Sequence, residues 1–303
     1  MKVRIGGGVG TVTGPSSGPE AVTSRAFTEL VTAMSDFGFD SIWLPEILTA
    51  PTLDPLTALA FAAGRHPGLK LGTTMLLPGR NVLRLAKELA TLDRLSDGRL
   101  LVTLVPGIPR SAEASATGVP PPARGRLMDE MLPLLRRLWA GETVSYDGSA
   151  GLIDGVRLEP RPLQDPLEVW TGGIAPAALE RCGCLADGWL PSACTPAEVA
   201  EGRQVVEAAA ARAGRAISPE HFGVSIGYSM APLDEATLRL LSSLRRRGDP
   251  AAVVPVGYDG LRATLEEFLD VGFSKFVLRP IQPPASWPEE LERLAGAVLD
   301  LQT

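Results

Sequence analysis

The chain alternates between short runs of β-branched and other apolar residues and longer stretches whose apolar residues recur at helical spacing. In one such stretch Val82, Leu85, Leu89, Leu92 and Leu95 form a single apolar stripe, which predicts a helix packed on one face. The short runs predict strands at residues 3–5, 40–44, 69–75, 100–105, 167–171, 187–190, 222–230 and 275–278. Predicted helices follow at residues 19–37, 54–63, 82–95, 126–140, 176–184, 196–213, 234–247 with 260–271, and 288–301.

This order of elements predicts an α/β protein built as a (β/α)8 TIM barrel, because eight strands are each followed by a helix. Asp54 and Asn81 are expected to cap the second and third helices. Residues 106–125, rich in Pro, Gly, Ser and Ala, fit no element, and residues 142–164 predict a hairpin inserted between the fourth helix and the fifth strand. Barrels of this length commonly form one unit, so we expect residues 1–303 to form a single domain.

Charge and composition exclude several classes of protein. The 29 Lys and Arg residues against 35 Asp and Glu give a net charge of −6 without a basic run, which disfavours a nucleic-acid partner. No apolar stretch approaches the roughly 18–20 residues that span a bilayer, and the N-terminus has no signal-like hydrophobic region. Three cysteines, two of them Cys182 and Cys184, cannot form a disulfide framework, so we expect a cytoplasmic protein.

Two short sequence motifs resemble known catalytic or cofactor-binding patterns, but the residues around them do not support either function. The run Gly6-Gly7-Gly8-Val9-Gly10 lacks the third glycine of a dinucleotide-binding loop, since positions 11 and 13 are both Thr, and is interpreted as a flexible connection or a backbone contact for a ligand. Ser225 lies in a G-x-S-x-G sequence, but no histidine follows it, so we interpret it as a strand residue.

The chain also offers few side chains for metal or acid–base chemistry. Cys194 and the Cys182/Cys184 pair have no nearby histidine to complete a zinc site and are expected to be structural thiols. Only two histidines are present, so a cofactor must supply the chemistry of any reaction.

An ordered set of segments closely resembles the bacterial luciferase-like monooxygenase superfamily, in its F420-dependent oxidoreductase branch, and residues 252–261 and 301–303 look most like an actinobacterial group of that branch. The segments are GFDSIWLPE at 38–46, LGTTM at 71–75, LAKELATLDRLSDGR at 85–99, RRLWAG at 136–141, PRPL at 160–163, WTGG at 170–173, DGW at 187–189 and DVGFSKFV at 270–277. Each segment alone is weak evidence, but their order covers nearly the whole chain.

The resemblance implies a barrel that holds reduced F420, or less often FMN, at the C-terminal ends of its strands. Thr73, Thr74 and Met75 would close the third strand against the cofactor ring, and the family often has a non-proline cis peptide bond at the position of Thr74-Met75. Such a bond costs about 3–4 kcal/mol and persists only where its surroundings hold it. An ordinary trans strand end is the alternative.

Further cofactor contacts follow from the same resemblance and from position. Thr171, Gly172 and Gly173 end the fifth strand, where glycines let a ring or phosphate approach the backbone. Gly107 and Arg110 match a loop that wraps the cofactor in relatives. Arg279 directly follows the eighth strand and is a candidate to bind an anionic substrate or cofactor tail. The expected cofactor-binding residues are therefore Thr73, Thr74, Met75, Gly107, Arg110, Thr171, Gly172, Gly173 and Arg279.

Departures from the family pattern bear on the reaction. The acid–histidine pair of F420-dependent dehydrogenases falls on Glu46-Ile47, and the acid after the fourth strand falls on Ile108, which disfavours alcohol oxidation because that reaction needs a base. Glu46 and Tyr228 remain the candidate catalytic proton donors. We therefore expect an F420-dependent oxidoreductase acting on a small organic substrate. The alternatives are an FMN-dependent monooxygenase and a cofactor-binding relative without activity; exposed apolar helix faces also permit a homodimer.

Overall fold

Eight parallel strands form the centre of the molecule. The computed structural model describes residues 1–9, 23–50, 52–108, 117–244 and 248–303. The strands are β1 (Arg4–Gly8), β2 (Ser41–Pro45), β3 (Lys70–Leu76), β4 (Leu100–Val105), β7 (Val169–Thr171), β8 (Gly188–Trp189), β9 (Gly223–Tyr228) and β10 (Lys275–Pro280). They pair in the order β8-β7-β4-β3-β2-β1-β10-β9, and isolated parallel bridges join Trp189 to Phe222 and Ser192 to Ser225. These bridges connect the two end strands, so the sheet is a nearly closed barrel and the predicted fold is confirmed.

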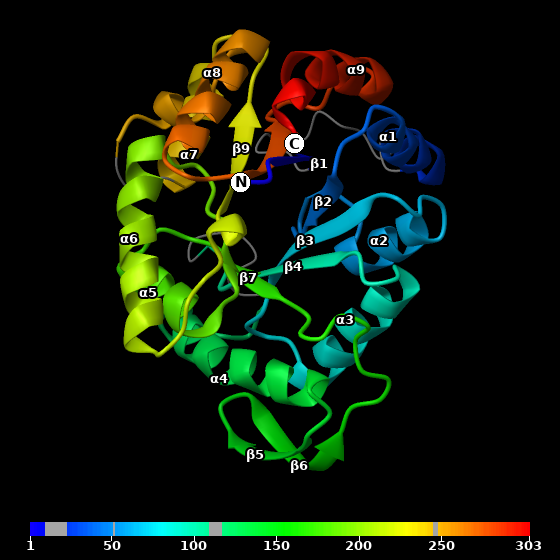
Figure 1. Cartoon of the computed structure of the whole chain (residues 1–303), viewed down its shortest axis with the longest axis vertical. Helices are drawn as coiled ribbons and strands as arrows, with labels where there is room; N and C mark the ends of the chain where they lie inside the picture. The colour runs from blue at the N-terminus through cyan, green and yellow to red at the C-terminus, as the bar shows by residue number, and fades with distance from the viewer. Residues whose placement is uncertain (10–22, 51, 109–116, 245–247) are drawn as a thin grey trace.

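Helices surround the strands on the outside (Figure 1). They are α1 (Ser24–Asp36), α2 (Pro55–Ala63), α3 (Val82–Leu95), α4 (Pro121–Trp139), α5 (Pro176–Leu185), α6 (Pro196–Arg212), α7 (Glu235–Leu244), α8 (Gly257–Asp270) and α9 (Trp287–Val298), with 3-10 turns η3 (Pro219–His221), η4 (Pro250–Val253) and η5 (Leu299–Leu301). Both predicted caps are present: Asp54 accepts a hydrogen bond from the Thr57 backbone N–H at 2.9 Å, and Asn81 accepts one from Arg84 at 3.0 Å. None of the described helices is long and apolar enough to cross a membrane.

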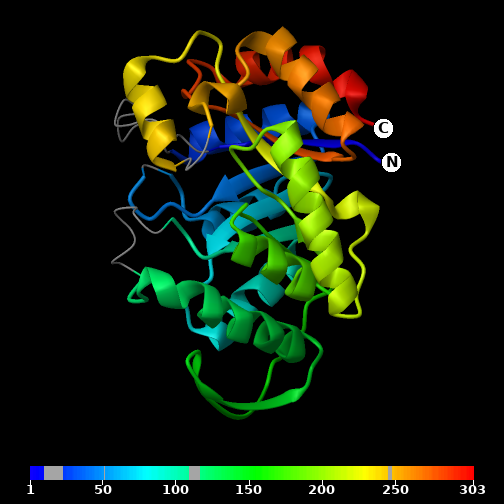
Figure 2. The same ribbon diagram turned by 90° about the vertical axis from the view of Figure 1, so that its left-hand side faces the viewer.

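The predicted insertion is an antiparallel hairpin of β5 (Thr143–Gly148) and β6 (Gly151–Arg157). It lies beyond α4, away from the barrel strands (Figure 2). Glu130 on α4 accepts hydrogen bonds from the Tyr146 hydroxyl and from the Ser149 backbone N–H, which fixes the hairpin to the helix.

Two sequence interpretations need correction. Helix α4 begins at Pro121, five residues before the predicted start at 126, because prolines at the first helical positions lose no hydrogen bond there. The glycines Gly6, Gly7 and Gly8 do not form a flexible connection; they are part of strand β1 and pair with both β2 and β10.

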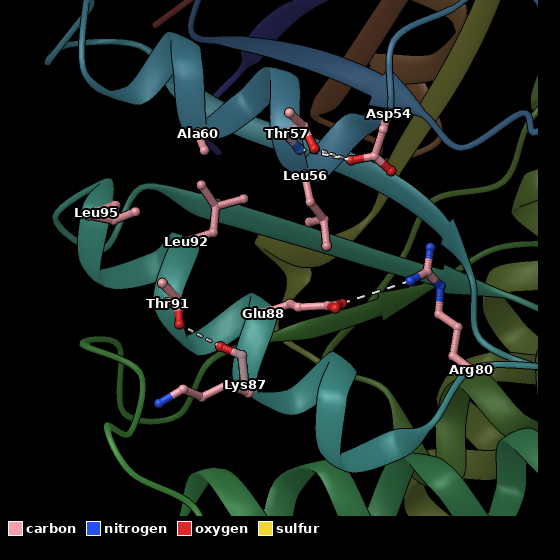
Figure 3. A pocket seen from close by; sticks show the side chains of 10 residues that line it. All are labelled: Asp54, Leu56, Thr57, Ala60, Arg80, Lys87, Glu88, Thr91, Leu92 and Leu95. Atoms are coloured by element: carbon pink, nitrogen blue, oxygen red, sulfur yellow. Dashed lines mark hydrogen bonds and ion pairs between the residues drawn. The ribbon is translucent and has the colours of Figure 1, made fainter.

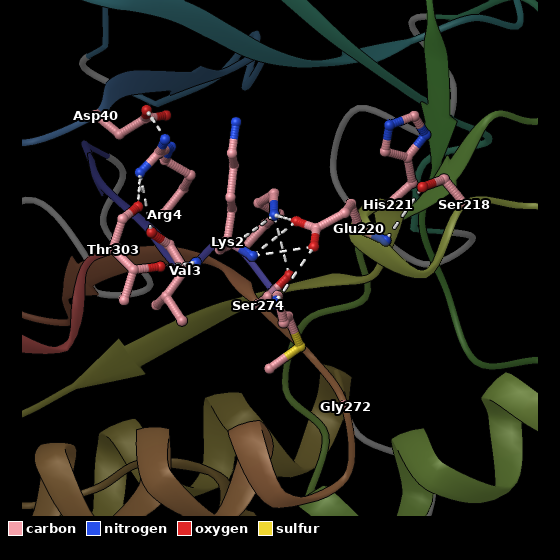
Figure 4. Close-up of polar contacts among 12 residues, drawn as sticks. Lys2, Val3, Arg4, Asp40, Ser218, Glu220, His221, Gly272, Ser274 and Thr303 are labelled. Carbon is pink, nitrogen blue, oxygen red and sulfur yellow. Dashed lines mark hydrogen bonds and ion pairs between the residues drawn. The ribbon is translucent and has the colours of Figure 1, made fainter.

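Polar residues close the N-terminal end of the barrel and join the two ends of the chain (Figure 4). The Lys275 ammonium group lies 2.8 Å from the Glu220 carboxylate, which also accepts from the Lys2 backbone N–H at 3.0 Å. Arg4 pairs with Asp40 at 3.3 Å and contacts the backbone oxygen of Thr303. Contacts among β1, β10, Glu220 and the C-terminal residues therefore hold this end of the barrel together.

Candidate active site

The barrel is open to solvent at the C-terminal ends of its strands. Residues that alternate along each strand point either outward to the helices or inward, and the outward positions Leu44, Met75, Leu104, Ile226 and Leu278 are buried. Several inward positions in the same part of the barrel are partly exposed, namely Trp43, Thr74, Val105, Trp170, Ser225, Gly227 and Arg279. Since helices cover the outward face, solvent reaches these residues from inside the barrel.

Three large inward side chains occupy space that glycines leave free. A Cβ atom on Gly72 would lie 2.2 Å from the Trp43 ring, and one on Gly188 would lie 2.4 Å from the Trp170 ring. A Cβ atom on Gly8 would lie 2.5 Å from Cγ of Arg279. The glycine run in β1 is thus required by the side chains packed across it.

Arg279 is the main charged group inside this part of the barrel. Its Nε donates a hydrogen bond to the Ser225 hydroxyl at 2.9 Å. Among the residues that the structure describes, no carboxylate pairs with it, and burial lowers the pKa of its guanidinium. A cation in this position favours a negatively charged ligand.

The side chains of the predicted cofactor contacts Thr73, Thr74 and Met75 do not lie on the same face of strand β3. Thr74 points inward, whereas Thr73 is buried on the outward face and donates to the Leu44 carbonyl at 3.0 Å. Met75 is also buried outward. The predicted cis bond at Thr74-Met75 is wrong: within the described ranges the cis bonds are Glu159-Pro160 and Asp165-Pro166. Strand β3 instead continues in regular register with β4 as far as Leu76.

The residues that end β7 also divide between the two faces. Thr171 is buried on the outward side near Cys182, whose pKa burial raises to about 12. Gly172 points inward, and a Cβ atom there would lie 3.0 Å from the Leu190 carbonyl oxygen. Gly173 has a φ of 94°, which favours glycine. Local packing therefore accounts for the glycine pair, while the inward side of Gly172 remains part of the barrel lining.

The loop after β4 is described only at its ends. Gly107 has a φ of 78°, and a Cβ atom on it would lie 2.9 Å from the Leu76 side chain. It therefore adjoins the end of β3. Arg110 lies outside the described residues.

Glu46 does not present a free carboxylate to the barrel interior. Its side chain is 5% exposed and forms an ion pair with Arg80, while Oε2 accepts from the Leu76 backbone N–H at 2.8 Å. Arg80 also donates from Nε to the Leu76 carbonyl at 3.1 Å. These contacts fix the segment between β3 and α3, which is a structural use of the acid.

Tyr228 likewise points away from the interior. It is 1% exposed, and its hydroxyl donates to Glu290 of α9 at 2.6 Å. Burial, reinforced by Glu290, raises the pKa of the phenol well above its ordinary value. The two sequence-predicted proton donors therefore lie on the outer sides of their strands and are not brought together.

Sequence reasoning missed the inward residues Trp43, Trp170 and Thr103 and gave Ser225 no role at the site. Thr103 pairs with Thr74 and Trp170 in adjacent strands, and its buried Oγ1 has no hydrogen-bond partner in the part of the chain that the structure describes. Side chains on one face of a strand recur at every second position. Counting in steps of two from Gly72 and Gly172, which lie on the inward face, could therefore have identified the inward positions of these strands.

A separate groove of about 420 Å3 lies on the outer surface between α2 and α3 (Figure 3). Its lining comprises Asp54, Leu56, Thr57, Ala60, Arg80, Lys87, Glu88, Thr91, Leu92 and Leu95, none of which belongs to the inward row. Within the described part of the chain, no cluster of His, Cys, Asp or Glu is arranged to hold a metal ion. The barrel interior is therefore the candidate site.

A TIM barrel with a solvent-accessible interior at the C-terminal ends of its strands defines the general class of protein, in which that end is the usual site of chemistry. The luciferase-like monooxygenase family model matches residues 4–273. The chain therefore belongs to the luciferase-like monooxygenase family.

Solved structures of similar fold span the chain. The F420-dependent tetrahydromethanopterin reductase of Methanopyrus kandleri is 18% identical with a TM-score of 0.78, and the match covers 100% of both chains. Monooxygenase RslO1 of Streptomyces bottropensis is 23% identical with a TM-score of 0.78, covering 98% of this chain and 99% of that one. An F420-dependent secondary alcohol dehydrogenase bound to an F420-acetone adduct is 19% identical with a TM-score of 0.79, again covering 100% of both. At these identities the likeness establishes the fold.

Proposed function

We propose that this chain is an F420-dependent oxidoreductase that acts on a small organic substrate inside the C-terminal end of the barrel. The observation that carries the proposal is the partly exposed inward row of residues, bounded by helices and lined by Trp43, Thr74, Trp170 and Arg279. Family membership supports an oxidoreductase, and two of the structural neighbours are F420-dependent.

The residues present fit a flat, anionic cofactor. The Thr103 hydroxyl is a buried polar atom without a partner, Gly172 leaves the wall beside Val105 without a side chain, and Arg279 is a cation without an acidic neighbour among the described residues. Thr74, Gly172 and Arg279 are the predicted contacts that face the interior. A bound deazaflavin supplies hydride transfer, whereas a bound reduced FMN also permits chemistry with O2.

The side chains that line the site are better suited to positioning and enclosing a substrate than to transferring protons. Glu46 is held by Arg80, and Tyr228 is hydrogen-bonded to Glu290 outside the barrel. The inward hydroxyls of Thr74 and Ser225 orient polar groups but do not titrate near neutral pH. Solvent that reaches the interior is therefore the expected source of the proton in a reduction.

The second candidate is an FMN-dependent monooxygenase. The monooxygenase RslO1 favours it, as does a riboflavin lyase bound to modified FMN, which is 16% identical with a TM-score of 0.76 and is matched over 93% of its length and 98% of this chain. A cofactor-binding relative without activity is the third alternative, because neither candidate acid faces the interior.

Separate titrations of the purified protein with F420 and with FMN test the proposal. We expect saturable quenching of cofactor fluorescence with F420 and weaker binding of FMN. The reverse preference would favour the monooxygenase, and no saturable signal with either ligand would contradict an enzyme of this kind. Binding without turnover of enone, imine or carbonyl substrates would favour the non-catalytic alternative.

Variants of two adjacent threonines test on which face of β3 the cofactor ring binds. Thr74→Val changes an inward hydroxyl and should weaken cofactor binding at least about threefold, with little effect on stability. Its matched control, Thr73→Val, removes the outward hydrogen bond to Leu44 and should lower the free energy of unfolding by about 1 kcal/mol without changing cofactor affinity. Equal effects of both variants on binding would place the cofactor elsewhere.

A further inference from the structure

Arg279 differs from the other partly buried arginines in what surrounds it. Arg80 pairs with Glu46, and Arg136 lies 2.9 Å from Asp187. Arg99 has no ion pair within the described ranges, but it donates to the carbonyl oxygens of four residues, Ala63, His66, Leu69 and Ser96. Among the described residues, the one hydrogen-bond partner of Arg279 is the neutral hydroxyl of Ser225.

The unsatisfied part of Arg279 is the part best suited to an anion. A guanidinium has five N–H donors, and the bond to Ser225 uses the one on Nε. The remaining four N–H groups belong to the two terminal nitrogens, which match the paired oxygens of a carboxylate or phosphate. A cation that is partly removed from water and has no counter-charge among the described residues is costly, so an oxyanion in this position is favoured over a neutral carbonyl.

Neighbouring strands hold the arginine in place. Its stem packs against Gly8 on β1, and Ser225 on β9 fixes Nε from the other side of β10. Trp43 on β2 is paired in register with Gly8, so an aromatic ring lies on the neighbouring strand. The guanidinium thus lies between β1 and β9 on the inward side of the barrel strands, where a small organic acid is the expected ligand.

We propose that Arg279 binds an oxyanion, a carboxylate or phosphate group, inside the barrel and so makes the site selective for acidic small molecules. The inference deepens the proposed function, on which it rests for the substrate's position, by naming the substrate class. Ser225 is a positioning residue, because it orients the guanidinium without contacting the anion.

Calorimetric titration without any redox cofactor tests the binding. The probes are benzoate, succinate and inorganic phosphate, with benzamide and succinamide as neutral controls, all at low constant ionic strength. Wild-type protein should bind at least one anion saturably and no amide. Arg279→Gln should weaken that binding about tenfold or more, and Arg279→Lys should bind less tightly than wild type because it lacks the planar fork. Arg25→Gln, which alters an exposed arginine paired with Glu29, is the matched control and should leave binding unchanged.

Thermal unfolding of the wild-type protein keeps the test independent of whether the variants fold. A bound anion stabilises the folded state by an amount that grows with the logarithm of its concentration above Kd, so the acids should raise the unfolding midpoint and the amides should not. Equal binding of acids and amides by wild-type protein, or wild-type affinity in a folded Arg279→Gln variant, would overturn the proposal.

Comparing FMN with riboflavin identifies the source of the oxyanion. If Arg279→Gln weakens FMN binding but not riboflavin binding, the oxyanion is the cofactor phosphate. If it weakens binding of the organic acids alone, the oxyanion belongs to the substrate. A protein that binds acids through Arg279 but binds neither F420 nor FMN would retain this inference and refute the proposed function.

Discussion

At the scale of single residues, Glu46 is used for structure although its position after β2 suggested catalysis. In Glu46→Gln the amide retains an oxygen for the Leu76 N–H but leaves Arg80 without its closest counter-charge. We expect the free energy of unfolding to fall by about 2 kcal/mol in urea denaturation. Glu88→Gln is the control, because Glu88 is half-exposed and 3.9 Å from Arg80, and it should change stability by less than about 0.5 kcal/mol. Unchanged stability in Glu46→Gln, together with lost turnover, would restore the catalytic interpretation.

Tyr228 gives a second residue-scale prediction, based on its ionisation. Burial and the bond to Glu290 raise the pKa of the folded phenol, so its contribution to stability is present below the unfolded pKa of about 10 and is lost as pH rises above it. The wild type should therefore lose stability more steeply above about pH 10 than Tyr228→Phe does. Urea denaturation of both proteins across this range measures the difference. Parallel curves would mean that Tyr228 ionises freely in the folded state.

At the scale of elements, the inward row of each strand depends on glycines that leave room for large side chains. Gly72→Ala would place a Cβ atom 2.2 Å from the Trp43 ring, whose Nε1 donates to Ser41 at 3.0 Å. The ring must move, so we expect a loss of about 1–3 kcal/mol in stability and a shift in tryptophan emission.

The control for this variant is a glycine with free space around it. Gly296→Ala lies in α9, where the new Cβ atom meets nothing within 4 Å, and should raise stability by about 0.5–1 kcal/mol. If both substitutions stabilise the protein, the Trp43 ring does not pack against Gly72 as the structure shows.

Periodicity along the chain predicted the order of the elements better than it predicted the direction of individual side chains. Helix α2 and strand β4 match their predicted bounds closely because caps and apolar patterns are local. The strand at Gly6–Gly8 was missed because glycine has low strand propensity, and only contacts from β10 and β2 explain it. Thr73 and Thr171 were assigned to the cofactor from resemblance, although their strand register turns them outward. Register between distant strands is a tertiary property, so a single sequence specifies it weakly.

At the scale of the whole molecule, polar contacts at the N-terminal end of the barrel join residues that are far apart in sequence. Glu220 is central, because it accepts from Lys275 of β10 and from the backbone of Lys2. The Lys275 ammonium holds the pKa of Glu220 down to about 2, whereas burial lowers the pKa of Lys275 itself despite this partner. The N-terminal residues and the last strand are therefore coupled through one carboxylate.

The sign of this coupling determines how stability depends on pH. Because the folded pKa of Glu220 is lower than its unfolded value of about 4.3, the carboxylate stabilises the fold above that pH and loses its contribution as pH falls toward 2. Glu220→Gln should therefore flatten the decline in stability between about pH 5 and pH 2, measured by urea denaturation at several pH values. Glu29→Gln, on the exposed side of α1, should leave the slope unchanged. An unaltered slope in Glu220→Gln would show that other carboxylates control acid unfolding, and the barrel would then close without the charge pair between β10 and η3.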